Sequence, residues 1–138
     1  MKTILFVDDD RIFRELCKQV FQEEGYRVIL AEDGEEALHA AGVERVDVAV
    51  LDVRMPGMDG LELAQELNSV APSLPLIFYT ANDDMCAADG RSRYGAACVD
   101  KNTGFTELAM AITRILSPTG HRDAFRIGLP PRTATMAL

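Results

Sequence analysis

Two kinds of hydrophobic segment alternate along this chain. Short apolar runs, typical of strands buried on both faces, occur at residues 4–7, 26–31, 46–51, 76–79 and 97–99. Between them, apolar residues recur at the spacing of an amphipathic helix over residues 12–21, 33–41, 59–67 and 105–116, and more weakly over 83–94. Because strands that alternate with helices pair in parallel, this pattern predicts a parallel sheet of five strands with helices on both faces.

Polar residues and glycine mark where the predicted helices begin and end. Asp33 followed by Glu36, and Asp59 followed by Glu62, have the spacing of a capping box, so each pair is expected to open a helix. Gly25 follows the first helical stretch and provides the residue type at which many helices end. These signals support the boundaries that the hydrophobic pattern predicts.

The alternating pattern stops at Leu116. The residues beyond it are rich in proline, glycine and other turn formers and show no further strand or helix pattern. A chain of 138 residues is long enough for one domain with one hydrophobic core. We therefore expect one domain over residues 1–116 and a mobile C-terminal tail over residues 117–138.

The composition restricts the classes of function. The formal net charge is −8, which disfavours binding to nucleic acid phosphates or to anionic membrane surfaces. No apolar run approaches the roughly 18 residues that a bilayer span needs, and the run at the start is shorter than a signal peptide requires. We therefore expect a cytoplasmic protein with no nucleic-acid or membrane binding within these residues. Cys17, Cys86 and Cys98 lack metal-site spacing and are expected to be buried and unpaired.

Residues with chemical potential follow four of the predicted strands. The first strand ends in Asp8, Asp9 and Asp10, of which Asp10 is also in position to cap the next helix, and the third strand ends in Asp52. The fourth strand ends in Thr80. In a parallel α/β sheet, ligands bind at the carboxyl ends of the strands, so these side chains are expected at one edge of the protein.

Three carboxylates at one edge would repel one another, and a hard divalent cation would relieve this repulsion. Mg²⁺ prefers oxygen ligands and keeps several waters, so one or two of Asp8, Asp9 and Asp52 would be enough to bind it. The fifth strand ends near Lys101, whose ammonium can pair with a phosphoryl oxygen, and the hydroxyl of Thr80 can donate a hydrogen bond to one. A carboxylate nucleophile, a metal site, a hydroxyl and a cation together favour phosphoryl transfer to an aspartate.

At this point the sequence resembles the receiver domains of bacterial two-component response regulators, the chemotaxis-type fold. The motifs that carry the resemblance are residues 4–10, residues 50–60, Thr80 with Ala81, and Lys101. The likeness covers residues 2–116. It implies a flavodoxin-like receiver fold with the strand order 2-1-3-4-5.

The resemblance also implies a function in phosphorelay signalling. Asp52 would accept a phosphoryl group from a sensor histidine kinase, and the domain would itself catalyse only its own phosphorylation and dephosphorylation. Asp9, Asp52 and the backbone carbonyl of Arg54 would bind Mg²⁺, and Asp8 would act mainly through water.

Output in this family passes from the acceptor site to another protein. Thr80 and Lys101 would bind the phosphoryl oxygens, and the face made by helix 4, strand 5 and helix 5 would contact a downstream protein. Homodimerisation linked to phosphorylation is one form that this output takes. Arg54 and Asn82, two residues beyond the acceptor and beyond Thr80, would set the lifetime of the phosphoryl group.

The chain departs from the family pattern near the fifth strand. Asn102 follows Lys101, where the family usually has a proline joined by a cis bond, so we expect a trans peptide and a differently shaped loop. Cys98 stands where the family usually has an aromatic switch residue, and Gly95 lies one residue closer to the lysine than usual. We therefore expect conserved acceptor chemistry with an unusual output mechanism.

Two alternatives stay open. Asp8-Asp9-Asp10 loosely fits the Asp-x-Asp signature of haloacid-dehalogenase-type phosphatases, in which Asp8 would be the nucleophile and Asp52 would not. A chain that keeps the receiver fold but works by protein contact alone, without phosphorylation, is the other alternative.

Overall fold

The structure is a computed structural model, and it describes residues 1–81 and 94–117. The strands are β1 Thr3–Val7, β2 Arg27–Ala31, β3 Val48–Leu51, β4 Leu76–Thr80 and β5 Ala97–Asp100. The helices are α1 Arg11–Glu23, α2 Gly34–Val43, α3 Gly60–Val70 and α5 Thr106–Leu116, and a 3-10 turn, η2, covers Lys101–Thr103.

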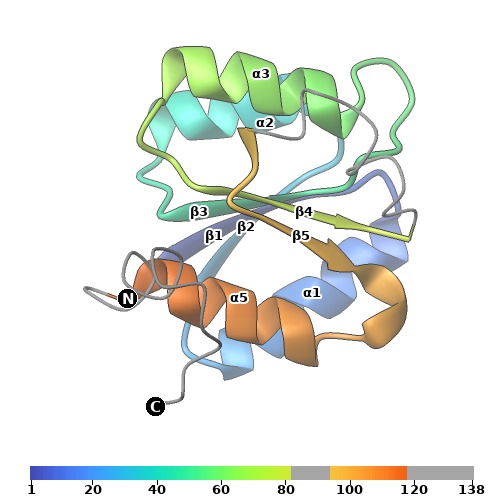
Figure 1. Cartoon of the computed structure of the whole chain (residues 1–138), viewed down its shortest axis with the longest axis vertical. Helices are drawn as coiled ribbons and strands as arrows, with labels where there is room; N and C mark the ends of the chain where they lie inside the picture. The colour runs from blue at the N-terminus through green and yellow to red at the C-terminus, as the bar shows by residue number, and fades with distance from the viewer. Residues whose placement is uncertain (82–93, 118–138) are drawn as a thin grey trace.

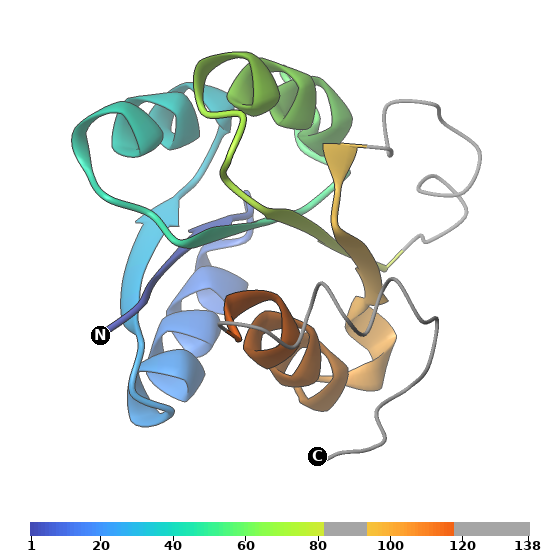
Figure 2. The same ribbon diagram turned by 60° about the vertical axis from the view of Figure 1, so that its left-hand side comes forward.

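The strands form one parallel sheet in the order β2-β1-β3-β4-β5. Helices α2 and α3 cover one face of the sheet, and α1 and α5 cover the other (Figures 1 and 2). The predicted fold class and strand order are therefore confirmed. The helix predicted over residues 83–94 falls almost wholly outside the described residues, as does the tail after residue 117.

Alternating side chains of each strand supply two separate hydrophobic clusters. In β1, Leu5 and Val7 pack toward α2 and α3, whereas Ile4 and Phe6 pack toward α1 and α5. All four side chains are at most 3% exposed, as expected for a strand that has helices on both faces. The two clusters fix the strands in register and so determine which residues meet at the carboxyl edge.

Side-chain caps set the start of three helices. Asp10 opens α1 by accepting hydrogen bonds from the backbone N–H groups of Ile12 and Phe13, at 3.0 and 3.2 Å. Asp59 and Glu62 form the predicted capping box at the start of α3.

The predicted box at the start of α2 forms only in part. The Asp33 carboxylate accepts from the backbone N–H of Glu36 at 2.9 Å, as a cap should. The Glu36 carboxylate, however, accepts from the backbone N–H of Glu32 at 3.0 Å instead of returning to Asp33.

Two strands begin later than predicted. The backbone N–H of Tyr26 bonds to the carbonyl of Phe21 at the end of α1, so β2 starts only at Arg27. Val46 packs partly buried against the core before the ladder begins, and β3 starts at Val48. The predicted strands were too long because Tyr26 and Val46 are apolar, although neither belongs to a hydrogen-bonded strand.

The cysteine prediction holds for Cys17 and is wrong for Cys98. Cys17 is buried and free. Cys98 is exposed and disulfide-bonded; its neighbours Ala97 and Val99 pack on the face of the sheet toward α1 and α5, so the Cys98 side chain points to the opposite face.

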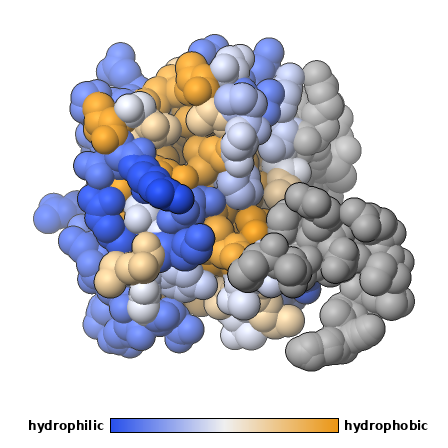
Figure 3. Space-filling model, turned by 90° about the vertical axis from the view of Figure 1, so that its left-hand side faces the viewer, coloured by the Kyte–Doolittle hydropathy of each residue, from blue (hydrophilic) through white to orange (hydrophobic). Residues whose placement is uncertain are grey.

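At the face formed by the amino-terminal ends of the strands, hydrophilic residues dominate the left part of the view, and hydrophobic residues show in its upper and middle parts (Figure 3). Val43 and Val70, which end α2 and α3 at this edge, are separate exposed apolar residues. Among the helices of the described residues, none is both long and apolar enough to cross a bilayer.

Candidate phosphoacceptor site

The sheet brings the predicted site residues to its carboxyl edge. The backbone N–H of Asp8 bonds to the carbonyl of Ala31 at 3.1 Å, which continues the β1–β2 ladder to the first carboxylate. The backbone N–H of Asp52 bonds to the carbonyl of Val7 at 2.9 Å, so Asp52 lies directly beside the end of β1. Lys101 follows the last residue of β5.

Three carboxylates form the acidic part of this edge. Oxygen atoms of Asp8, Asp9 and Asp52 all lie within 4.8 Å of one another. Asp8 and Asp52 are only 5% and 8% exposed, whereas Asp9 is exposed. Buried carboxylates at this spacing need a compensating positive charge.

Lys101 supplies that charge in the described structure. Its Nζ atom lies 2.5 Å from Oδ2 of Asp8 and 3.4 Å from Oδ2 of Asp52. The Nζ atom also lies over the ring of Phe13, 4.5 Å from the ring centroid. The ammonium is therefore held between two carboxylates and an aromatic face.

The pKa shifts reflect this mixture of burial and charge. Burial is the largest cause of the raised pKa of Asp52, and the charge of Asp8 raises it further, whereas Lys101 and the backbone N–H of Arg54 lower it. Burial alone would lower the pKa of Lys101, but its hydrogen bond to Asp8 and the charges of Asp8 and Asp52 raise the pKa overall. An additional cation near Asp52 would therefore stabilise the charged form of its carboxylate.

Thr80 and Arg54 complete the set of residues predicted from the sequence. Thr80 is 1% exposed at the last position of β4, where it pairs in register with Asp100 of β5. Arg54 is exposed, and its backbone N–H donates to Oδ1 of Asp52 at 3.4 Å. The roles predicted for Thr80 in phosphoryl binding and for the Arg54 carbonyl in metal binding stay predictions.

Close backbone packing holds the loop that carries Asp52. The backbone N–H of Gly60 bonds to the carbonyl of Val53 at 2.9 Å. A Cβ atom at Gly60 would overlap the backbone carbonyl of Asp52 and would lie 2.8 Å from the Cα atom of Val53. Glycine at position 60 therefore lets α3 begin directly against the acceptor loop.

The loop after β5 has the trans geometry predicted from Asn102, since no peptide bond of the described residues is cis. It forms the 3-10 turn η2, and Lys101 reaches the carboxylates from the first residue of that turn. Sequence reasoning missed two residues around it, Phe13 and Tyr79. Their apolar spacing indicated only core positions, and no sequence signal marks an aromatic ring that faces a lysine.

The fold and this acidic edge define a class of protein. The chain belongs to the response regulator receiver domain family, whose family model matches residues 4–113. Among its relatives is the response regulator MprA of Mycobacterium leprae, 46% identical over 122 residues, a match that covers 88% of this chain and 54% of the relative. The matches span about half or less of the length of these curated relatives, from 54% for this MprA to 36% for the MprA of Mycolicibacterium vanbaalenii and 35% for that of Mycobacterium ulcerans.

Solved structures of the same class are also similar. The response regulator TrrA of Thermotoga maritima, crystallised in complex with Mg²⁺ and BeF, is 39% identical with a TM-score of 0.80. The match covers 84% of this chain and all of that one. The complex of TrrA with the histidine kinase ThkA gives a TM-score of 0.79 at the same identity, covering 85% of this chain and 100% of TrrA.

Proposed function

We propose that this chain is a phosphoacceptor switch in which Asp52 takes a phosphoryl group from a histidine kinase. The observation that carries the proposal is the position of Asp52, a buried carboxylate within 4.8 Å of Asp8 and Asp9 and 3.4 Å from the ammonium of Lys101. Family membership and the existence of a kinase complex of the relative TrrA support it.

The proposed reaction is an in-line displacement at phosphorus. An Oδ atom of Asp52 forms the new O–P bond, the N–P bond of a phosphohistidine breaks, and the released imidazole takes up a proton. Lys101 pairs with a phosphoryl oxygen, and the Thr80 hydroxyl donates a hydrogen bond to another. Water later hydrolyses the acyl phosphate, so the domain catalyses only its own phosphorylation and dephosphorylation.

The ligand set fits Mg²⁺. Asp9 and Asp52 offer carboxylate oxygens, Arg54 offers its backbone carbonyl, and Asp8 completes the cluster through water. Bound Mg²⁺ would neutralise charge on the transferred phosphoryl group. The raised pKa of Asp52 fits this assignment, because a buried carboxylate beside a second one is stabilised in its charged form by a cation. The Mg²⁺ complex of TrrA supports the choice of metal.

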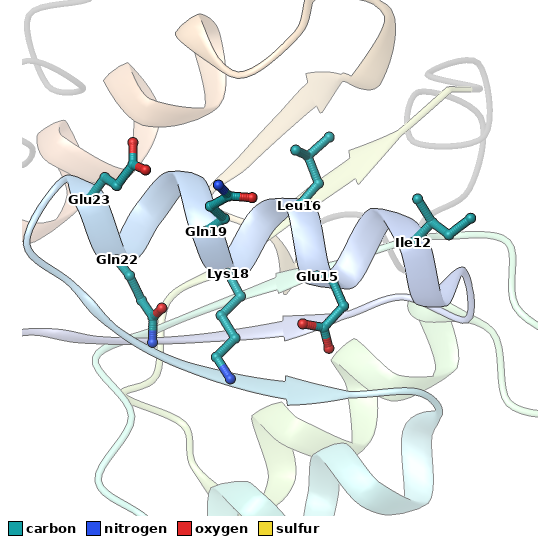
Figure 4. Close-up of a pocket in the computed structure, with 7 residues that line it drawn as sticks. All are labelled: Ile12, Glu15, Leu16, Lys18, Gln19, Gln22 and Glu23. Atoms are coloured by element: carbon teal, nitrogen blue, oxygen red, sulfur yellow. The ribbon is translucent and has the colours of Figure 1, made fainter.

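The phosphodonor would dock on the exposed face of α1. A protein that brings a phosphohistidine to Asp52 has to contact the surface around the acidic edge, and α1 begins directly after those acids. Ile12 and Leu16, one helical turn apart, are 80% and 44% exposed and line a shallow groove with the polar residues of that face (Figure 4). Exposed apolar residues at such a place favour a protein partner.

The remaining parts of the functional assignment rest on the sequence. Output through the face of helix 4, β5 and α5, to a downstream protein or by homodimerisation, involves residues outside the described ranges. The domain over residues 1–116, the tail over residues 117–138 and the cytoplasmic location likewise stay predictions.

Intact-mass spectrometry after incubation with acetyl phosphate and Mg²⁺ tests the proposal. We expect one added phosphoryl group on the wild type and none on Asp52→Asn. Asp47→Asn, at the amino edge of the sheet where Asp47 accepts from the backbone of Thr3, serves as the matched control and should still be phosphorylated. Absence of the adduct from the wild type would favour a binding module that works without phosphate. Phosphomonoester turnover that is lost in Asp8→Asn and kept in Asp52→Asn would favour the phosphatase alternative.

A further inference from the structure

The turn after β5 is held by hydrogen bonds. The Asp100 carboxylate accepts from the backbone N–H of Asn102 at 2.8 Å, and the Thr103 hydroxyl donates to the Asp100 carbonyl at 2.7 Å. The backbone N–H of Gly104 donates to the Lys101 carbonyl at 3.1 Å, and Gly104 adopts a positive φ of 79° that ends the turn. A local set of polar contacts therefore shapes the segment in which a proline is usual in this family.

Tyr79 ties this turn to strand β4. Its hydroxyl donates to the carbonyl of Gly104 at 2.6 Å, across 25 residues of sequence. The Tyr79 side chain is 2% exposed on β4, the strand next to β5. Burial raises the pKa of Tyr79 to about 12, so the hydroxyl keeps its proton and remains a donor even at a pH at which an exposed tyrosine ionises. The backbone immediately after Lys101 is thus anchored to a fixed strand.

Phe13 provides a second support for Lys101. Its ring faces the Nζ atom at 4.5 Å and lies 5.8 Å, centroid to centroid, from both the Tyr79 and the Phe105 rings. The ring stacks on Phe105 with an interplanar angle of 22°. Phe13 is therefore itself held in place on α1, with its face toward the ammonium of Lys101.

We propose that Phe13 and Tyr79 are positioning residues that aim the Lys101 ammonium at the acceptor carboxylate, Phe13 through its ring face and Tyr79 through the turn that carries Lys101. This inference rests on the proposed function, in which that ammonium pairs with a phosphoryl oxygen. Phe13 and Tyr79 would thereby support the loop in which Asn102 stands at the position where this family usually has a proline.

A lysine needs such supports because its charge is a point at the end of a flexible four-carbon stem. Asp8 and Asp52 attract the ammonium from one side, and the negative face of the Phe13 ring attracts it from another. When a phosphoryl group displaces part of the contact with the carboxylates, the ring and the turn remain to restrict the positions of the stem. A purely structural role of the two rings would instead affect only the stability of the core.

Five variants separate these two roles. Phe13→Leu removes the aromatic face and keeps apolar bulk, and Tyr79→Phe removes only the hydroxyl. The matched controls are Phe21→Leu, which loses a buried ring of the same aromatic group, and Tyr26→Phe, which loses the hydroxyl of a tyrosine whose ring contacts Phe21. Phe13→Tyr restores an aromatic face and is the conservative rescue.

Four quantities are measured on each folded variant. NMR gives the chemical shift of the Lys101 ε-methylene protons, which we expect the Phe13 ring current to move upfield even without a ligand. Titrations give the affinity for Mg²⁺ alone and the affinity for beryllofluoride, a phosphoryl mimic, in saturating Mg²⁺. Urea unfolding gives the stability.

If Phe13 and Tyr79 position Lys101, their variants should change the Lys101 shift or the beryllofluoride affinity, and the control variants should not. Phe13→Leu should lose the upfield shift and weaken beryllofluoride binding roughly three- to ten-fold, as expected for one cation–π contact, with Mg²⁺ affinity retained or raised. Tyr79→Phe should weaken beryllofluoride binding roughly two-fold or more, and Phe13→Tyr and both controls should bind it as the wild type does.

Other outcomes overturn the inference. Equal beryllofluoride affinity in Phe13→Leu and the wild type would do so, as would a loss in Phe21→Leu as large as that in Phe13→Leu. If the wild type fails to bind beryllofluoride, the proposed function fails instead. The Lys101 shift then decides on positioning alone, because its persistence in Phe13→Leu would show that the ring does not face the ammonium.

Discussion

The Nζ atom of Lys101 lies 2.5 Å from Oδ2 of Asp8, a contact that joins residues 93 positions apart in the sequence. In this arrangement the lysine ammonium neutralises the same carboxylates that a metal ion would bind. The side chains are 18% and 7% exposed, so water weakens the attraction less than it would at the surface. The same ammonium therefore stabilises the carboxylates in the described structure and would compete with a bound cation for them.

Removing this ammonium should strengthen Mg²⁺ binding. In Lys101→Ala the carboxylates of Asp8 and Asp52 lose their partner, and a cation then gains the whole of their attraction. We expect the Mg²⁺ dissociation constant to fall about three- to thirty-fold, measured by isothermal titration calorimetry. Lys2→Ala, which changes the net charge equally at an exposed position before β1, should leave it unchanged. Weaker Mg²⁺ binding in Lys101→Ala would contradict this competition.

Neutralising the acceptor should stabilise the fold when no Mg²⁺ is present. Asp52 is a buried carboxylate within 4.8 Å of those of Asp8 and Asp9, and an amide of the same shape removes this repulsion. We expect Asp52→Asn to raise the free energy of unfolding by about 0.5–2 kcal/mol, measured by urea denaturation in EDTA. The gain should shrink in saturating Mg²⁺. Asp47→Asn should show no gain, and neither should Asp52→Asn if the carboxylates do not interact.

The carboxyl edge was predictable because few physical rules determine it. Alternating strand and helix patterns require parallel strands, and parallel strands bring Asp8, Asp52 and Lys101 to one edge from distant parts of the sequence. Capping hydrogen bonds at helix starts were less predictable, because a carboxylate can accept from any of several nearby backbone N–H groups. Glu36 satisfies the backbone N–H of Glu32 instead of that of Asp33, and the spacing of these residues does not distinguish the two outcomes.

Contacts that depend on side-chain direction were not predictable from spacing. Phe13 has the periodicity of a core residue, and it does pack on Phe105, yet the same ring faces Lys101. Cys98 was predicted to be buried because cysteine usually is, but Ala97 and Val99 take the face of β5 that packs toward α1 and α5, and Cys98 on the opposite face is exposed. Both results depend on which face of an element meets which neighbour, and the assembled sheet determines that.

The start of α3 should be intolerant of a side chain at position 60. A Cβ atom on Gly60 would overlap the Asp52 carbonyl, so Gly60→Ala has to push α3 away from the acceptor loop. We expect a loss of about 2–4 kcal/mol in unfolding free energy and slower phosphorylation by acetyl phosphate. Gly42→Ala is the matched control, because a Cβ atom there meets nothing within 4 Å and alanine favours the helical conformation of α2. That change should raise stability by about 0.5–1 kcal/mol, and equal losses at both positions would show that Gly60 does not pack as described.

Stability should fall as the pH rises above about 9, because two buried groups resist losing their protons. Burial raises the pKa of the Cys17 thiol from 9.0 to about 12, and burial likewise raises that of Tyr79 from 10.0 to about 12. Between these values the unfolded chain binds fewer protons than the folded one, so the free energy of unfolding decreases with pH. Cys17 alone accounts for a loss on the order of 3–4 kcal/mol, complete near pH 12. Urea unfolding from pH 8 to pH 12 should therefore show a shallower decline in stability for Cys17→Ala than for the wild type. The part of the decline that is due to Tyr79 should remain in the variant. Parallel declines in the two proteins would mean that the thiol is not buried in the folded state.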